Sequence, residues 1–540
     1  AIAGALLLMR CGLLLILLPL AAFAEERICG TRWLETQRQS LPAPAAKTLE
    51  ARQEDAPIEV GTQLPFFVPT DPLLNLATCR YKGEHCYIFV EESQWDILVA
   101  QPDVDKLGEL FDRSTPADPE RGMYDLAVEA FGPPPDRDGD PRVFILVLDI
   151  PDDRVVGYFD RSVYKHVQET LRRDTVYLDA RKLVFEAYLG RGTLAHEFQH
   201  LIHWGHDEDE EAWVDEGLAG YAEELTGFPE TDPSMVPSFL DNTDRDLTRW
   251  PFPAAPESYG KTYLFASFLA ERYGPELIRR VVAEPRNGIF GIDEAFKDDN
   301  WVQDYAGAWS EWIAANYAAD DPDYGYRALR GRRAFAFSAP VLPFDPIGGR
   351  VNNPWGTTNV IIRAAGGRKN IEVDFAGSAD GRYAVWAYAM RGGSGEMIAV
   401  ELDGANAGRV RAPGVDSLAV IVGRTSLAGG DFTLAARSSI APTAVAAGAG
   451  AVPEATALDP VYPNPFNHSV VLPFRLARAA AAELGIYNAL GQRVALLLSQ
   501  RLGAGNYRAR WNGDNAASGP YTAVLKADGV VRSRHLILVK

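Results

Sequence analysis

Four of the eight histidines in the chain lie between positions 196 and 206. Two of them belong to the segment His196-Glu197-Phe198-Gln199-His200. Residues four positions apart share one face of a helix, so His196 and His200 can bind a single metal ion. Glu197 follows the first histidine and can take a proton from a water molecule that the metal has acidified. The spacing therefore predicts two zinc ligands and a general base within five residues.

The residues around this motif favour a helix. Thr193 has a side chain suited to capping the N-terminus of that helix. Leu194, Phe198 and Leu201 recur at helical spacing and predict an apolar face opposite the histidines.

A catalytic zinc site needs a third protein ligand and an open fourth position. Glu216 is the candidate that we favour, because it lies in a second predicted helix and would complete a His2Glu site. Gly217 and Gly220 would let this second helix approach the first closely.

His206 is the alternative third ligand. It follows His196 by ten residues, which is where a metzincin carries its third histidine. The glycine that turns the chain in that pattern is replaced here by His203, and only Met235 is available for a downstream Met-turn.

Both segments together resemble a known family. His-Glu-x-x-His followed by Trp-x-x-Glu-Gly-x-Ala, from Trp213 to Ala219, resembles the gluzincin metallopeptidases. The flanking residues, including Leu194, His203 and Tyr221, are most similar to the hyicolysin-like bacterial branch. The resemblance covers about residues 60–330 and implies a zincin-type fold with Glu216 as the third zinc ligand.

A further segment resembles a catalytic motif of the gluzincin aminopeptidases. Ser258-Tyr259-Gly260-Lys261 is similar to their Tyr-x-Lys-Gly, with Thr262 in place of the last glycine. The resemblance implies that Tyr259 stabilises the oxyanion of the transition state, whereas packing at a helix start is the other interpretation.

Three aspartates alternate around Gly139. Asp136, Asp138 and Asp140 offer the oxygen ligands that calcium prefers, but Val147 stands where a full EF-hand loop has its bidentate glutamate. We interpret the segment as a polar turn, with calcium as the alternative.

Cysteine use is consistent with export. Cys79 and Cys86 bracket six residues between two strand-like runs, which predicts a hairpin disulfide in an oxidising compartment. Cys29 lies in a polar segment, residues 25–60, that is typical of an N-terminal arm or pro-segment. The sequence leaves the fate of Cys29 open.

The first 24 residues are typical of a secretory signal peptide. They are mainly apolar, carry Arg10, and end in the small-x-small sequence Ala22-Phe23-Ala24. No later stretch is long and apolar enough to predict a membrane span. The net charge of −20 argues against general affinity for nucleic acid or anionic membranes.

The 540 residues predict an α+β protein of several domains. A strand buried on both faces is expected at 143–148, and another strand is expected at 175–178. A helix that begins around Tyr263 is expected to end at Gly274. Short β-rich runs separated by glycine and polar residues predict a β-sandwich at 340–437. The expected segments along the chain are a signal peptide (1–24), an arm or pro-segment (25–60), a metallopeptidase domain (61–335), the sandwich (340–437), a linker (438–458) and a second β-rich domain (459–540).

The last domain has its own resemblance, to the C-terminal sorting domain of type IX secretion cargo. The motifs that carry it are Tyr462–Asn467, Ile486–Val494, Trp511–Gly513, Ser518–Tyr521 and Leu536–Lys540. This resemblance implies an immunoglobulin-like sandwich and a partner in the type IX secretion machinery. It also implies delivery to the surface or surroundings of a Gram-negative-type bacterium.

Taken together, these patterns predict a secreted zinc endopeptidase that acts on protein or peptide substrates. A metzincin-type protease using His206 is one alternative. A catalytically silent surface adhesin or binding protein is the other, although the presence of Glu197 argues against it, since a purely structural zinc site needs no base.

Overall fold

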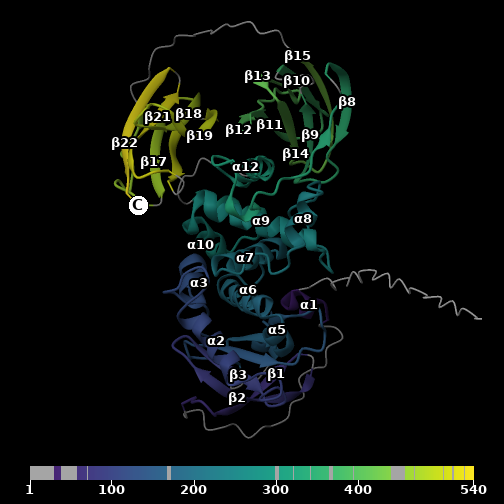
Figure 1. Cartoon of the computed structure of the whole chain (residues 1–540), viewed down its shortest axis with the longest axis vertical. Helices are drawn as coiled ribbons and strands as arrows, with labels where there is room; N and C mark the ends of the chain where they lie inside the picture. Colours follow the sequence, from purple (N-terminus) through teal and green to yellow (C-terminus); the bar gives the residue numbers. More distant parts are fainter. Residues whose placement is uncertain are drawn as a thin grey trace, which may run out of the picture.

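The computed structural model describes residues 29–37, 57–69, 71–166, 172–297, 303–319, 321–340, 342–363, 369–392, 394–438, 456–467, 469–502, 504–513, 516–527 and 529–539 (Figure 1). The predicted signal peptide and most of the predicted linker lie outside these residues. The described chain is α+β, with helices and several β-sheets. Within it, no helix has both the length and the apolar character needed to cross a membrane.

The N-terminal sheet has six strands in the order β1-β2-β3-β4-β6-β5. They are β1 (Gln63–Val68), β2 (Asp71–Lys82), β3 (Cys86–Glu91), β4 (Val143–Leu148), β6 (Thr175–Asp179) and β5 (Gly157–Phe159). β3, β4 and β6 are parallel to one another, whereas β5 pairs antiparallel with β6 and forms one edge. The strands expected at 143–148 and 175–178 are therefore confirmed.

Alternate residues of the central strands enter two different apolar clusters. Ile145 and Val147 face the large cluster that the helices build, while Phe144 and Leu146 face a smaller cluster on the opposite side. Because both faces are covered, β4 is apolar at every position. The helical part comprises α2 (Gln101–Asp112), α3 (Met123–Phe131), α4 (Val163–His166), α5 (Ala180–Phe185), α6 (Ala187–His206), α7 (Ala212–Leu225), α8 (Met235–Leu240), α9 (Pro256–Tyr273), α10 (Pro275–Ala283), α11 (Gly288–Lys297), α12 (Tyr305–Ala318) and the 3₁₀ turn η2 (Arg327–Leu329).

The predicted disulfide between Cys79 and Cys86 is wrong, since both are free thiols. Cys79 pairs in register with Phe89, and a bulge follows it in β2. Its side chain enters the smaller apolar cluster, whereas that of Cys86 enters the larger one. The two thiols therefore lie on opposite faces of the sheet, which prevents a bridge.

Two packed sheets follow the helical part. One has the order β13-β10-β15-β8 and the other β12-β11-β14-β9-β7. Their strands are β7 (Phe337–Ser338), β8 (Phe344–Arg350), β9 (Gly356–Arg363), β10 (Lys369–Gly377), β11 (Tyr383–Arg391), β12 (Ser394–Ala399), β13 (Ala407–Val415), β14 (Ser417–Arg424) and β15 (Asp431–Ser438). The inward side chains of both sheets form one core. A Cβ at Gly423 would lie 2.5 Å from Trp309, so β14 packs directly on α12.

The C-terminal part forms another pair of sheets, ordered β16-β17-β20 and β19-β18-β21-β22, around its own core. The strands are β16 (Ala457–Leu458), β17 (Ser469–Leu476), β18 (Ala480–Asn488), β19 (Arg493–Leu502), β20 (Gly505–Asn512), β21 (Gly519–Ala527) and β22 (Val530–Leu538). Arg510 of β20 donates to the carbonyl of Tyr273 at 2.7 Å, so this part contacts the end of α9.

Candidate metal centre

Helix α6 carries the two histidines of the motif. It begins at Ala187, so Thr193 lies within it, and the prediction that Thr193 caps the helix is wrong. The six residues before Thr193 form its first turns, which apolar periodicity alone did not reveal. Leu194, Phe198 and Leu201 are fully buried, as the predicted apolar face requires.

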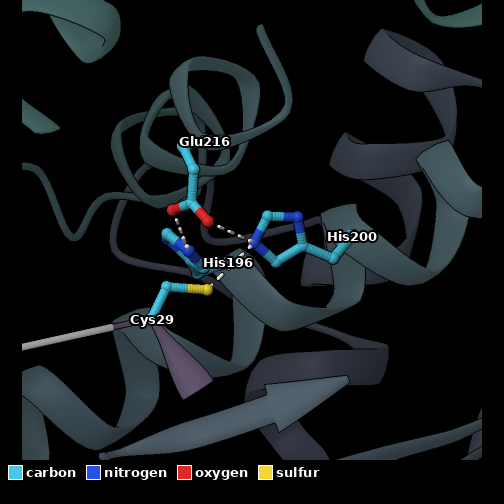
Figure 2. Close-up of side chains that lie close together, drawn as sticks. All are labelled: Cys29, His196, His200 and Glu216. Carbon is cyan, nitrogen blue, oxygen red and sulfur yellow. Dashed lines mark hydrogen bonds and ion pairs between the residues drawn. The ribbon is translucent and has the colours of Figure 1, made fainter. Parts of the chain in front are cut away.

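Four donor side chains meet beside this helix (Figure 2). His196, His200, Glu216 and Cys29 bring one ligand atom each to within 4.8 Å of one another, and all four residues are buried. Nε2 of His196 lies 3.5 Å from Glu216 Oε2, and Nε2 of His200 lies 3.7 Å from Oε1. Sγ of Cys29 lies 3.4 Å from His200 Nε2.

The donor set fits a zinc ion. His196 Nε2 and Glu216 Oε2 are buried and have no hydrogen-bond partner among the described residues. Such orphaned polar atoms are costly unless something else binds them. Burial opposes ionisation of Glu216, but the neighbouring His196 and His200 outweigh it and hold its pKa below the usual range. Two imidazoles and a carboxylate are a ligand set that tetrahedral zinc accepts.

Carboxylates behind the histidines orient their rings. Nδ1 of His196 lies 2.9 Å from Glu223 Oε1, and Nδ1 of His200 lies 3.1 Å from Asp215 Oδ2. The second oxygen of Asp215 bonds Nδ1 of His203 at 2.8 Å. Each motif histidine therefore turns its Nε2 toward the donor cluster. Carboxylates behind the ligands orient histidine rings in metal sites in the same way.

Glu223 is a residue of the site that sequence reasoning did not find. The residue is buried and also accepts from Thr231 at 2.7 Å. It follows Glu216 by seven residues, two helical turns, so both carboxylates share one face of α7. That spacing was the available signal.

Glu197 lies beside the cluster. Its Oε2 accepts from the Phe159 amide at 3.0 Å and from Thr31 Oγ1 at 2.7 Å. Burial raises the pKa of Glu197, with partial opposition from His200 and His196. A carboxylate with a raised pKa is a better proton acceptor than one in water.

Tyr259, on α9, faces the same cleft. The cleft is also lined by Val156, Gly157, Glu216 and Met235, among other residues. The hydroxyl of Tyr259 accepts from the Cys29 amide at 2.8 Å. Burial raises the pKa of Tyr259 well above its usual value, so its hydroxyl stays protonated and can donate.

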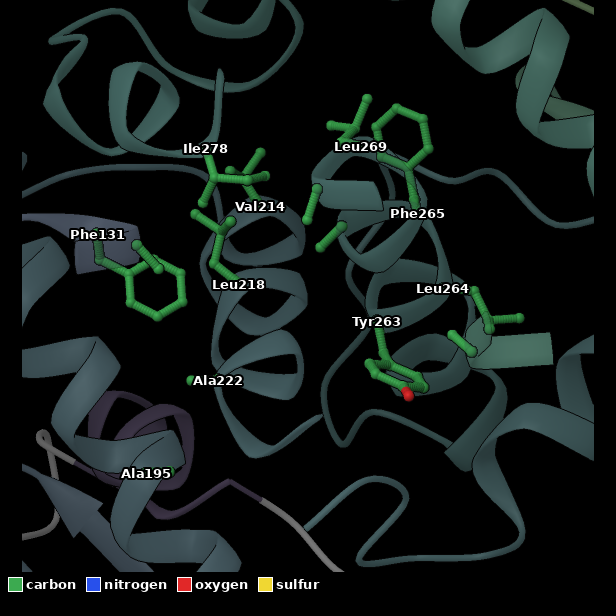
Figure 3. Close-up of a cluster of buried hydrophobic side chains, with 14 of the residues drawn as sticks. Phe131, Ala195, Val214, Leu218, Ala222, Tyr263, Leu264, Phe265, Leu269 and Ile278 are labelled. Carbon is green, nitrogen blue, oxygen red and sulfur yellow. The ribbon is translucent and has the colours of Figure 1, made fainter. Parts of the chain in front are cut away.

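Helix α7, which carries Glu216, packs closely on α9 (Figure 3). A Cβ at Gly217 would lie only 2.8 Å from the Thr262 carbonyl oxygen, and one at Gly220 would lie 3.2 Å from Tyr263 Cβ. The sequence predicted that these glycines let α7 approach α6 closely. That prediction is wrong, because both glycines face α9. They set the distance between the helices that carry Glu216 and Tyr259.

His206, the alternative third ligand, lies elsewhere. It is in the last turn of α6, and its Nε2 bonds the Pro133 carbonyl oxygen at 3.0 Å. It does not belong to the group of donors that gathers around His196.

The alternating aspartates are only partly brought together. Asp136 and Asp138 gather with Asp174, which precedes β6, within 4.8 Å. Asp140 instead accepts from the Tyr87 hydroxyl at 3.0 Å. Calcium gains no support from this turn.

Comparison with known proteins gave one curated relative of note. The chain is 24% identical over 251 residues to the neutral metalloprotease ShpI of Staphylococcus hyicus. The match covers 41% of this chain and 53% of that protein, so the chain spans about half the length of the relative.

Solved structures resemble the chain only remotely. The pre-peptidase C-terminal domain of a Bacillus anthracis collagenase matches 19% of this chain and 95% of its own, with 12% identity and a TM-score of 0.16. A β-glycosidase from Bacteroides vulgatus matches 33% and 24%, with 10% identity and a TM-score of 0.12. Neither likeness bears on function.

The C-terminal residues match a family directly. The model for the secretion system C-terminal sorting domain covers residues 460–540. This confirms the resemblance drawn from the sequence motifs. The chain thus carries the sorting domain that marks proteins exported by the type IX system to the cell surface or the extracellular space.

Proposed function

We propose that the chain is a zinc-dependent peptidase, with His196, His200 and Glu216 as zinc ligands and Glu197 as general base. The observation that carries the proposal is the convergence of the three ligand atoms next to a buried carboxylate. The similarity to a neutral metalloprotease supports it.

His196, His200 and Glu216 would hold the zinc ion, which would supply Lewis-acid chemistry that makes a water proton more acidic and polarises the scissile carbonyl. Glu197 would accept the proton of the attacking water and pass it to the leaving amine. The Phe159 amide fixes one oxygen of Glu197 by a bond of 3.0 Å. Glu223 and Asp215 would hold the two imidazoles in place through their Nδ1 atoms.

Tyr259 would donate its hydroxyl to the developing oxyanion. It comes from α9 and lines the cleft together with Gly157 of the edge strand β5. Residues 61–335 would thus form a zincin-type peptidase domain of endopeptidase type. The sandwich at 340–437 and the linker at 438–458 would join it to the sorting domain, and residues 1–24 would be a signal peptide.

Zinc content and casein cleavage of the full chain test the proposal. Because residues 25–60 are a candidate pro-segment, cleavage is measured before and after limited proteolysis. We expect about one zinc per chain. Glu197→Gln should keep the metal and lose about 10²–10⁴-fold in turnover. Glu216→Ala should lose both zinc and turnover.

His206→Ala is the matched control, since it removes a nearby histidine outside the donor cluster. It should keep zinc and turnover. Loss of both in this variant would favour the metzincin-type site instead. Zinc binding without any cleavage, before or after proteolysis, would favour a binding protein.

A further inference from the structure

Residues 29–32 contact the proposed zinc ligands, the proposed general base Glu197 and Tyr259. Cys29 Sγ joins the donor cluster, and the Cys29 amide donates to the Tyr259 hydroxyl at 2.8 Å. Thr31 donates to Glu197 at 2.7 Å, and Arg32 Nε lies 3.3 Å from Glu216 Oε1.

From these contacts we propose that the arm keeps the enzyme latent, with Cys29 as the fourth zinc ligand. The inference rests on the proposed function. A thiolate is a good zinc ligand, and two histidines, one glutamate and one cysteine would close the tetrahedron that catalysis needs open.

The described part of the arm packs tightly against the rest of the domain. Its helix α1 (Gly30–Gln37) lies against the edge strand β5. A Cβ at Gly30 would be 2.1 Å from the Gly157 carbonyl oxygen, so only glycine fits there. Leu34 is buried in the smaller apolar cluster beneath the sheet. Arg32 is held between Asp215 and Glu216.

The packed arm occupies the cleft in which a substrate would have to bind. Cys29 lines the cleft together with His196 and Tyr259. Thr31 also exchanges hydrogen bonds with the backbone of Phe159, at 2.8 Å from its amide and 3.1 Å to its carbonyl oxygen. The Phe159 carbonyl oxygen belongs to an edge strand, where an extended peptide would otherwise pair.

Exchange of the Cys29 thiolate for water at the zinc would involve only proton transfer and would need no oxidant. Binding of Cys29 to zinc breaks its S–H bond and releases the proton to solvent. When the arm leaves, the Zn–S bond breaks, the thiolate takes up a proton, and the fourth position is left to water. Proteolytic removal of the arm makes this step irreversible.

X-ray absorption of the zinc-loaded full chain tests the ligand directly. We expect a sulfur scatterer at about 2.3 Å in the wild type and its loss in Cys29→Ala. Cys79→Ala is the matched control, because it removes a buried thiol on the sheet and should keep the sulfur signal. Only nitrogen and oxygen scatterers in the wild type would overturn the proposal.

Casein cleavage supplies the second readout. Cys29→Ala should cleave at least about 10-fold faster than the wild type, since one of its four ligand positions is open from the start. Gly30→Val keeps the thiol but cannot seat the arm, so it should be active and lack the sulfur signal. If both variants bind zinc and cleave no faster than the wild type, the arm does not inhibit. If no variant binds zinc, the proposed function itself fails.

Discussion

The Nδ1 atom of His196 lies 2.9 Å from Oε1 of Glu223, a carboxylate two turns beyond Glu216 on α7. One helix therefore supplies both a proposed ligand and the group that orients another ligand. Because the bond engages Nδ1, it leaves Nε2 of His196 turned toward Glu216.

Replacing Glu223 by Gln should weaken zinc binding by about 10–100-fold, because an amide orients and polarises the imidazole less well than a carboxylate. Competition with a chromophoric chelator measures the dissociation constant. Glu224→Gln is the control, because Glu224 is the next residue in the chain and its carboxylate accepts from Ser267, not from a histidine. Equal affinities in both variants would deny Glu223 this role.

Tyr259→Phe should lower kcat by about 10²-fold and leave KM and zinc content nearly unchanged. The reason is that the hydroxyl would act on charge that exists only in the transition state. Steady-state kinetics on a peptide substrate, with an enzyme freed of its arm, separates the two parameters. A rise in KM at constant kcat would instead assign Tyr259 to substrate binding.

Gly217→Ala should destabilise the fold by about 1–3 kcal/mol, because the new methyl group would press on the Thr262 carbonyl oxygen of α9. Thermal unfolding measures the loss. Gly307→Ala in α12 is the control, since its methyl group would meet the movable end of the Gln303 side chain. No difference between the two variants would mean that α7 can shift at little cost.

The motif itself was readable because helical spacing fixes which side chains share a face. His196 and His200 are four residues apart, and their apolar neighbours mark the opposite side of α6. The strand at 143–148 and the helix end at Gly274 were readable for similar local reasons.

Long-range contacts were not readable in this way. The approach of Cys29 to His200 joins residues 171 positions apart, and nothing in the composition of the arm indicates it. The faces of Cys79 and Cys86 depended on a bulge in β2 that sequence alternation does not show. Gly217 signalled a close contact, but only the fold shows that the partner is α9.

Asp138 should make stability depend on pH. Burial raises its pKa from 3.8 to about 6, helped by the charge of Asp174. Between these values the unfolded chain releases the proton while the folded chain keeps it, so stability falls as pH rises through this window. Asp138→Asn should therefore raise the melting temperature above pH 6 and have little effect near pH 4.

Melting is compared in chelator, so that no bound cation neutralises the aspartates. Asp136→Asn alters an exposed carboxylate of the same turn and serves as the control. A gain from Asp138→Asn that is the same at every pH would contradict the predicted ionisation.

Cys79 and Cys86 should remain thiols in the exported protein, because they lie on opposite faces of the sheet. Burial raises the pKa of Cys79 to about 11 and that of Cys86 well above its usual value, so neither should react with iodoacetamide in the folded chain. After unfolding without reductant, both should be alkylated, which mass spectrometry of tryptic peptides detects. A peptide pair that stays joined until reductant is added would show that β2 and β3 pair in a different register.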